Sequence, residues 1–314
     1  MGILPEKVSI YKNPFAKAAQ DAAGKGIFVI FYPPTGLVPP AGEMLYLRKA
    51  WRWLTVHDIE KWNEAAADYQ KVFLNGMSEY NRSLIGFLLD EGMLYPGCRV
   101  IDVGCGIGKY GSYFAAMGCD VTLTDISPGM LELARKNMSL YDSPWATLEC
   151  DFETVPPEHP LFSKPFELGF STMCPAIHDT ATVRKLSDMV EGSCFISHFV
   201  SWEEPLRRKF FAKMGFEPEE NMDRFSIHMD ALHQAVIDAG YKPHICHVPY
   251  NWCDERTAAE AADYLLKRVG NIKVSEELRE RAISAAAELC DERGIFSDEV
   301  HTTVAWLWWR TKGE

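Results

Sequence analysis

Residues 98–108 (CRVIDVGCGIG) decide the fold of this chain. The run opens with β-branched residues behind the Pro96-Gly97 turn, a pattern that predicts a short, buried central strand. Three glycines at alternate positions end this strand: Gly104, Gly106 and Gly108. Because glycine has no Cβ, the backbone amides of such a turn can approach a ligand closely. With the helix expected at residues 109–117, the strand, turn and helix predict a nucleotide-type crevice.

Three ligand classes use such a turn, and spacing and charge separate them. A phosphate loop has the pattern G-x-x-x-x-G-K followed by Ser or Thr, and residues 104–110 are one residue short of it. A dinucleotide fingerprint G-x-G-x-x-G can be matched at Gly106, Gly108 and Gly111, although a lone match is weak evidence. The carboxylate of Asp102 would repel a pyrophosphate at the helix N-terminus, whereas it would attract a ligand that carries an ammonium and a sulfonium.

Residues 102–108 (DVGCGIG) resemble the D-x-G-x-G-x-G signature of the class I S-adenosylmethionine-dependent methyltransferases. The resemblance implies an α/β fold with a Rossmann-like sheet of seven strands, mostly parallel with the last strand antiparallel. We expect a helical N-terminal extension at residues 1–90 and a core at 91–314, with helical insertions around 201–228 and 253–298. The resemblance also implies S-adenosylmethionine as methyl donor and S-adenosylhomocysteine as product, with no metal.

The second part of the signature follows at residues 120–125 (DVTLTD), where a second strand is expected to end in an acid. Asp125 is placed to accept hydrogen bonds from both ribose hydroxyls, and its alternative role is a cap or turn ahead of the helix at Pro128. By resemblance, Asp151 would contact the exocyclic amine of adenine and Phe152 its ring, unless the two are an ordinary strand end. The expected cofactor contacts are Asp102, Gly104, Cys105, Gly106, Gly108, Asp125, Ile126, Met130, Asp151, Phe152 and Met173.

A fourth strand is expected at residues 166–173. The segment after it carries the catalytic candidates, because the carboxyl end of that strand faces the transferred methyl in this fold. His178 is the first candidate for a general base, Asp179 would orient it or act itself, and His198 is the second candidate. The thiol of Cys174 could bind a soft metalloid or a thiol substrate, the alternative being a small buried apolar residue. Amine- and amide-directed branches of the family carry an Asn- or Asp-Pro-Pro-aromatic motif here. This chain has Met-Cys-Pro-Ala at residues 173–176 instead, so methylation of an exocyclic base amine is not expected.

Outside the core, the sequence predicts a strand at residues 26–32 and helices at 43–52, 58–74 and 78–89. Trp62 and Tyr69 share one face of the helix expected at residues 58–74. They would serve either as core packing or as a lid over cofactor and substrate. Trp202 is a further candidate for substrate contact.

The last third of the chain predicts a helix at 229–239, a sixth strand at 243–252, helices at 255–268 and 275–293, and a final strand at 300–310. We expect the final strand to return antiparallel beside the sixth. His244, Cys246, His247 and Cys253 have donor types that bind zinc, but neighbouring strand residues point to opposite faces, so no structural zinc site is expected.

Composition and charge limit the possible partners and the compartment of the protein. The 314 residues carry a net charge of −12, which argues against nucleic acid as partner because that binding depends on neutralising phosphates. Nine irregularly spaced cysteines and the absence of a basic-then-apolar N-terminal signal favour the cytosol, and the apolar run at 27–32 is too short to span a bilayer.

These observations predict a methyltransferase that acts on an oxygen, nitrogen or sulfur atom of a small molecule. The alternatives are an NAD-dependent oxidoreductase, suggested by the dinucleotide fingerprint, and a non-catalytic binding protein of the same fold. The sequence leaves the acceptor and the oligomeric state open.

Overall fold

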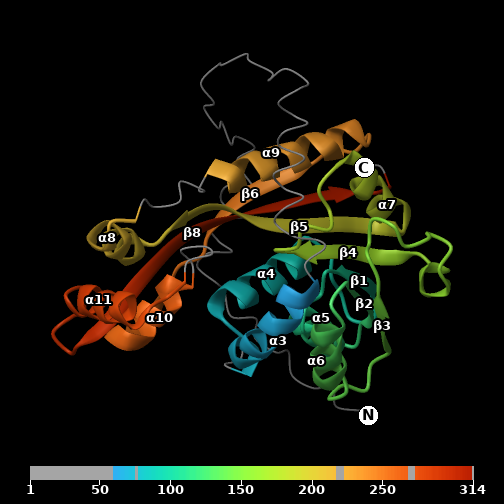
Figure 1. The fold of residues 1–314 in the computed structure, drawn as a ribbon. Helices are drawn as coiled ribbons and strands as arrows, with labels where there is room; N and C mark the ends of the chain where they lie inside the picture. The colour runs from blue at the N-terminus through green and yellow to red at the C-terminus, as the bar shows by residue number, and fades with distance from the viewer. Residues whose placement is uncertain (1–58, 75–76, 217–222, 268–272, 313–314) are drawn as a thin grey trace, which may run out of the picture. The chain divides into compact units, whose positions relative to one another are not determined.

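A computed structural model describes residues 59–74, 77–216, 223–267 and 273–312 (Figure 1). The chain divides into two compact units, Met1–Leu168 and Gly169–Glu314, and each is described by itself. The strand and helix expected at residues 26–32 and 43–52 lie outside the described residues. Among the described residues, no helix is both long and apolar enough to cross a membrane.

The sheet of the first unit is parallel. β1 (Arg99–Val103) pairs with β2 (Asp120–Asp125), which pairs with β3 (Trp145–Glu149). Val100, Ile101 and Val103 are completely buried, as expected for a strand covered on both faces. The central strand predicted from the sequence is therefore confirmed, and β4 (Phe166–Thr172) begins in this unit and ends in the next.

The helices of the first unit begin where the sequence places caps. Ser78 caps α4 (Glu79–Asp90) by accepting a hydrogen bond from the backbone N–H of Asn81. Ser127 caps α6 (Pro128–Met138) in the same way, with proline in its first turn. The remaining helices are α3 (Ile59–Leu74), α5 (Lys109–Ala116) and the short 3₁₀ helix η1 (Pro160–Phe162).

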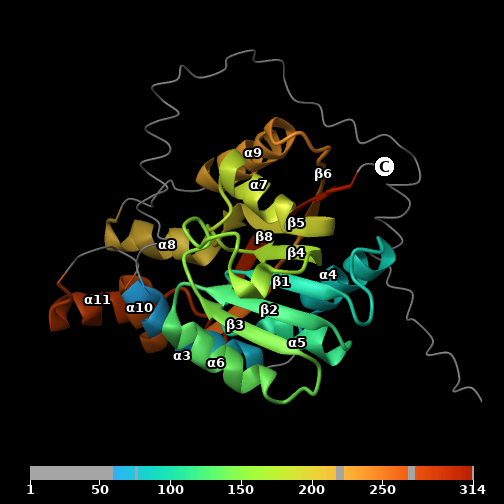
Figure 2. The same ribbon diagram turned by 90° about the vertical axis from the view of Figure 1, so that its right-hand side faces the viewer.

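Hydrogen bonds from side-chain amides connect α3 with α6, and the two helices lie side by side in Figure 2. Oδ1 of Asn63 accepts hydrogen bonds from the hydroxyl of Ser127 at 2.7 Å and from the backbone N–H of Gly129 at 2.9 Å. Seven residues along α3, Gln70 exchanges two hydrogen bonds of 3.0 Å with the buried Asn137. The N-terminal part of α3 is thereby held at the start of α6, next to the glycine turn.

In the second unit, two long strands carry the structure. β8 (Ile295–Arg310) lies between β5 (Val190–Glu203) and β6 (His244–Pro249) and is antiparallel to both. β7 (Trp252–Thr257) pairs with the first part of β8. The strand order is β3-β2-β1-β4-β5-β8-β6, with β7 off this path. The expected fold class is confirmed, including the antiparallel last strand beside the sixth, and β7 is an additional strand.

Helices cover the second unit in two groups. α7 (Thr180–Asp188) and α9 (Asp223–Asp238) pack on β5. The other group is α8 (Pro205–Met214), α10 (Ala258–Leu266) and α11 (Glu276–Ala287). In Figure 1 these three helices lie around the N-terminal end of β8. This second group has a core of its own, made by Phe210, Phe211, Met214, Ala261, Ala262, Leu265, Leu266, Ala282, Ala285, Ala286 and Phe296.

Several boundaries differ from the sequence expectation. The final strand begins at Ile295 and not at residue 300, and the sixth strand ends at Pro249 and not at residue 252. The helix expected from residue 255 begins at Ala258, because residues 252–257 pair with β8 and Thr257 forms a capping box with Glu260. The helix expected to continue to residue 293 ends at Ala287. The helix expected from residue 229 begins at Asp223, inside the expected insertion.

Candidate functional site

The glycine turn after β1 has the backbone conformation that its sequence predicts. Gly104, Gly106 and Gly108 have φ angles of +70°, +54° and +73°, a region that other residues rarely adopt. The backbone N–H groups of Gly104 and Cys105 donate to the carbonyl of Thr124 at 2.8 and 3.0 Å. A Cβ on Gly108 would lie 3.2 Å from that of Ala134, so this glycine also lets α6 approach the turn.

Asp125 ties the glycine turn to the start of α6. Its Oδ2 accepts a hydrogen bond from the backbone N–H of Gly106 at 2.8 Å, and its Oδ1 accepts one from that of Ser127 at 2.9 Å. Burial raises the pKa of Asp125, although these backbone hydrogen bonds oppose the shift. The helix cap itself is Ser127. Each carboxylate oxygen retains a further lone pair, so Asp125 can still accept from two ribose hydroxyls.

Asp102 is almost completely buried, with an exposed fraction of 2%, and its Oδ2 has no hydrogen-bond partner among the described residues. Burial, together with the nearby Asp125, raises the pKa of Asp102 to about 8. The free protein therefore holds this carboxyl largely protonated at neutral pH, whereas the charge argument from the sequence takes it as ionised. An ammonium group beside Asp102 would favour the carboxylate, so an unpaired buried acid of this kind fits a cationic ligand.

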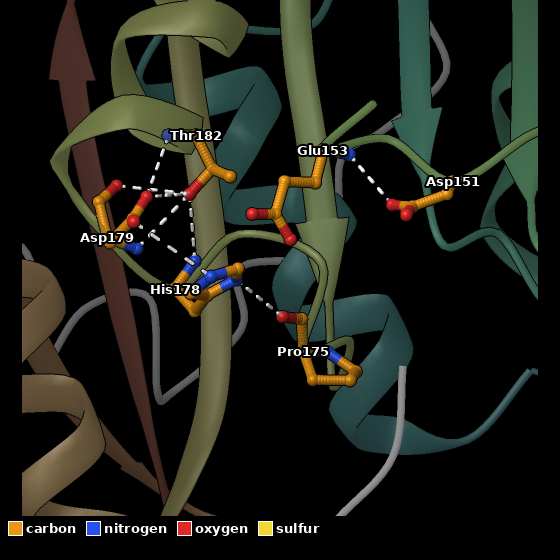
Figure 3. Close-up of polar contacts among 6 residues, drawn as sticks. All are labelled: Asp151, Glu153, Pro175, His178, Asp179 and Thr182. Carbon is orange, nitrogen blue, oxygen red and sulfur yellow. Dashed lines mark hydrogen bonds and ion pairs between the residues drawn. The ribbon is translucent and has the colours of Figure 1, made fainter. Parts of the chain in front are cut away.

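The residues expected at adenine lie at the turn that follows β3. The backbone N–H of Cys150 donates to the carbonyl of Asp125 at 3.0 Å, which places this turn beside the second strand end. Oδ1 of Asp151 accepts from the backbone N–H of Glu153 at 2.9 Å (Figure 3). Phe152 is 97% buried, since its exposed fraction is 3%, and little of its ring remains available to a ligand.

The two aromatic residues of α3 have different surroundings. Trp62 packs against a small cluster of Ala66, Ile107 and Met130, and Ile107 belongs to the glycine turn. The side chain of Tyr69 is half exposed. Ile126 is partly buried between Asp125 and the cap of α6. The structure thus brings Trp62 and Met130 to the glycine turn, and it leaves Tyr69 at the surface.

In the second unit, the chain leaves β4 through a strained residue. Among the described residues, Met173 is the only one other than glycine with a positive φ, at +51°. Its backbone N–H donates to the carbonyl of Ser197 at 2.8 Å. The half-buried thiol of Cys174 accepts from the backbone N–H of Ala176 at 3.5 Å. Backbone strain of this kind is often found at functional sites.

His178 and Asp179 immediately precede α7, and Figure 3 shows their side chains. Nδ1 of His178 lies 3.2 Å from the carbonyl of Pro175, and its Nε2 lies 4.0 Å from Oδ2 of Asp179, too far for a hydrogen bond. Asp179 forms a capping box with Thr182, accepting from its backbone N–H at 2.9 Å. In this structure the Pro175 carbonyl therefore orients His178, and Asp179 acts as the helix cap.

We expect Asp179→Ala to lower the free energy of unfolding by about 1 kcal/mol, the usual effect of losing an N-cap. Burial alone would raise the pKa of Asp179, but the hydrogen bonds from Thr182 and the charge of His178 hold it below its ordinary value. The cap's contribution is therefore present above pH 4 and lost as the pH falls through the lowered pKa. Urea unfolding at pH 7 and pH 3 measures both effects. An equal loss of stability at the two pH values would contradict the ionised cap.

A second histidine missing from the sequence expectations accompanies His198. The rings of His198 on β5 and His228 on α9 meet edge to face, with centroids 4.6 Å apart. Burial lowers the pKa of His198 to about 4, and burial together with the neighbouring His198 and His178 lowers that of His228 to about 2. Both imidazoles are neutral at pH 7. Only the packing of α9 on β5 reveals this pair, because the two residues are thirty positions apart.

The zinc-type residues of the last third do not form a site in the part of the chain that the structure describes, where no three His, Cys, Asp or Glu side chains are arranged to hold a metal ion. His244 instead stacks on Trp308, with ring centroids 5.4 Å apart. Trp202 contacts Phe199 and Trp252 edge to face, at 4.7 and 5.1 Å between ring centroids.

Comparison with known proteins supports the interpretation of the glycine turn as part of a methyltransferase signature. Residues 100–191 match a family model described as a methyltransferase domain. The malonyl-[acyl-carrier protein] O-methyltransferase of Serratia marcescens is 36% identical over 69 residues, which cover 22% of this chain and 26% of that protein. The magnesium-protoporphyrin O-methyltransferase of Rhodobacter capsulatus is 30% identical over 90 residues, covering 29% of this chain and 37% of that protein. The chain thus spans well under half the length of these relatives.

Solved structures give weaker likenesses. A putative methyltransferase from Bacillus halodurans is 16% identical, covers 74% of this chain and 100% of that chain, and has a TM-score of 0.45. Magnesium protoporphyrin IX methyltransferase from Synechocystis with bound SAH is 13% identical, covers 86% of this chain and 94% of that chain, and has a TM-score of 0.40. The signature at residues 102–108, the sheet built around it and the family match lead to one conclusion: residues 100–191 are similar to a methyltransferase domain.

Proposed function

We propose that the chain is an S-adenosylmethionine-dependent methyltransferase whose acceptor is an oxygen, nitrogen or sulfur atom of a small molecule. The observation that carries the proposal is the pair of acids at the ends of β1 and β2. Asp102 is buried with an unpaired oxygen, and Asp125 is bonded to the glycine turn. A cationic amino acid and a ribose are the two groups that such acids would bind.

When bound, the cofactor supplies a methyl group activated by its sulfonium, so most of the catalysis can come from positioning. The backbone of the glycine turn would hold the donor, with Asp125 on the ribose and Asp102 as counter-ion to the ammonium. Gly104, Cys105, Gly106, Gly108, Ile126, Met130, Asp151, Phe152 and Met173 remain proposed contacts.

On the acceptor side, His178 is the proposed general base. Its side chain is 34% exposed and is oriented by the carbonyl of Pro175, so Nε2 is available to take a proton from a hydroxyl, amine or thiol. His198, Cys174 and Trp202 are further candidates for acceptor contact. Three curated relatives are each named as an O-methyltransferase, and this supports oxygen as the acceptor atom.

Isothermal titration calorimetry of the full chain tests the proposal. We expect S-adenosylmethionine and S-adenosylhomocysteine to bind in a 1:1 ratio and NAD to give no heat. Binding of NAD without binding of S-adenosylmethionine would instead establish the oxidoreductase. Formation of S-adenosylhomocysteine over a panel of hydroxyl, amine and thiol acceptors, abolished by His178→Ala, would exclude a non-catalytic binding protein.

A further inference from the structure

The first part of β8, residues 295–304, has one buried face, which includes an acidic residue. Its even-numbered residues have exposed fractions of 3% or less, and they are Phe296, Asp298, Val300, Thr302 and Val304. Of the odd-numbered residues between them, Glu299 and His301 are exposed and the other two are partly buried. Side chains of β5 and β7 that stand opposite the even-numbered residues must lie on the same face.

A bulge in β5 places two aromatic residues on this face. Phe199 stands opposite Val304 and Trp202 opposite Thr302, with the irregularity at residue 200 between them. Because these two partners are both even-numbered, the bulge turns Phe199 and Trp202 to the same side, although they are three residues apart.

The other edge of β8 adds two more rings. Trp252 stands opposite Val300, and the backbone N–H of Tyr250 donates to the carbonyl of Thr302. Trp202 and Trp252 meet with ring centroids 5.1 Å apart, and Tyr250 lies 5.1 Å from Trp252 and 6.3 Å from Phe199. We call Phe199, Trp202, Tyr250 and Trp252 the aromatic quartet. All four side chains are partly exposed.

Carboxyl groups follow the quartet on the same face. Asp254 stands directly opposite Asp298, and Glu204 lies two residues beyond Trp202. Two acids directly opposite each other in a strand pair normally destabilise a sheet. The indole N–H of Trp252 donates to Asp254 at 3.3 Å, so the rings and the acids form one continuous cluster.

Two arginines form ion pairs with carboxyl groups of this cluster. Arg207 pairs with Glu204 at 2.6 Å, and Arg256 pairs with Asp254 at 3.2 Å. Each guanidinium is also held over a helix ring, that of Phe211 at 5.3 Å and that of Tyr264 at 3.9 Å. Among the residues that the structure describes, two of the three carboxyl groups thus have an arginine as ion-pair partner.

Asp298 is the carboxyl group left over. It is 2% exposed, and its Oδ1 is buried without a hydrogen-bond partner. Burial and the nearby Glu204 raise the pKa of Asp298 to about 6, Asp254 adds to this, and the backbone N–H of Leu206 and the charge of Arg256 oppose it. The group is therefore mostly ionised at pH 7, and a buried carboxylate with one oxygen left without a hydrogen bond is destabilising.

We propose that this face binds a small organic ammonium ion, with the aromatic quartet around its alkyl groups and the carboxylate of Asp298 as its counter-ion. Partly exposed aromatic rings attract such cations through their faces, most strongly when they are methylated ammonium groups. A metal ion fits less well, because within the described ranges no three donor side chains are arranged to hold one. The proposal does not depend on binding of S-adenosylmethionine.

Choline and its neutral isostere 3,3-dimethylbutan-1-ol test the proposal on the full chain, by calorimetry and by saturation-transfer NMR of their methyl signals. We expect one choline per chain and at least about tenfold weaker binding of the alcohol, which lacks only the charge. Asp298→Asn should weaken choline binding about tenfold and remove its dependence on pH between 5 and 7. Glu299→Gln, one residue away on the exposed face, is the matched control and should bind as the unaltered chain does.

Trp252→Leu should weaken choline binding by a similar factor, because it removes one ring of the quartet. If this variant fails to fold, Asp298→Asn carries the test, since it removes a buried charge and leaves the packing intact. Equal binding of choline and the alcohol would overturn the proposal, as would unaltered binding in Asp298→Asn. Displacement of choline by calcium chloride at lower concentration would overturn the choice of an organic cation.

Discussion

Replacing Asp125 with alanine should lower the affinity for S-adenosylmethionine about 100-fold, because hydrogen bonds to a buried carboxylate contribute about 1.5–3 kcal/mol each. The substitution removes the proposed acceptor for the ribose. It also removes the bonds to the backbone N–H groups of Gly106 and Ser127, which hold the glycine turn against the start of α6. Calorimetry with S-adenosylmethionine and S-adenosylhomocysteine measures the loss.

Asp120→Ala is the matched control, because Asp120 is the first residue of the strand that Asp125 ends. Its carboxylate pairs with Arg99 at 2.9 Å on a partly exposed surface, and such a pair contributes about 0–1 kcal/mol to stability. We expect cofactor affinity to be unchanged in this variant. A similar loss in both variants would mean that the sheet, and not the end of β2, determines binding, and the site assignment would fail.

The donor half of the site is predictable from the sequence because its signals are local. Glycines at alternate positions, a strand before them and a helix after them require no knowledge of distant residues, and the structure places each of these elements as expected. The same holds for the start of α6, where Ser127 and Pro128 are adjacent to the acid that ends β2.

The remainder depends on pairing between distant segments. Residues 252–257 contain charged residues and precede an alanine-rich run, so they resemble the start of a helix, and only their pairing with β8 makes them a strand. Asp179 follows a histidine in sequence, yet the backbone directs its carboxylate to Thr182. The charge state of Asp102 follows from complete burial, which no sequence pattern near it reveals.

Asp102→Asn should change stability and affinity in opposite directions. Its folded pKa of about 8 lies above the ordinary value of about 3.9. The wild-type protein therefore has its full stability below pH 4 and loses stability as the pH rises through 8, because ionisation of the buried group is penalised. Asparagine has no such charge, so we expect the variant to be more stable than the wild type at pH 8, by up to about 5 kcal/mol. Urea unfolding at pH 8 and at pH 5 measures this difference, which should shrink at the lower pH.

The affinity of the same variant for S-adenosylmethionine should fall at least about tenfold, since the proposed counter-ion of the ammonium is lost. In the wild type, an ammonium next to Asp102 lowers its pKa, so binding at pH 7 should release a proton from this carboxyl. Calorimetry in two buffers of different ionisation enthalpy detects that proton, and Asp102→Asn should release none. A misfolded variant would lose both stability and affinity, whereas the expected variant gains the first and loses the second. If the variant binds S-adenosylmethionine as tightly as the wild type and acquires affinity for NAD, then Asp102 excludes a dinucleotide, and the proposed donor site is wrong.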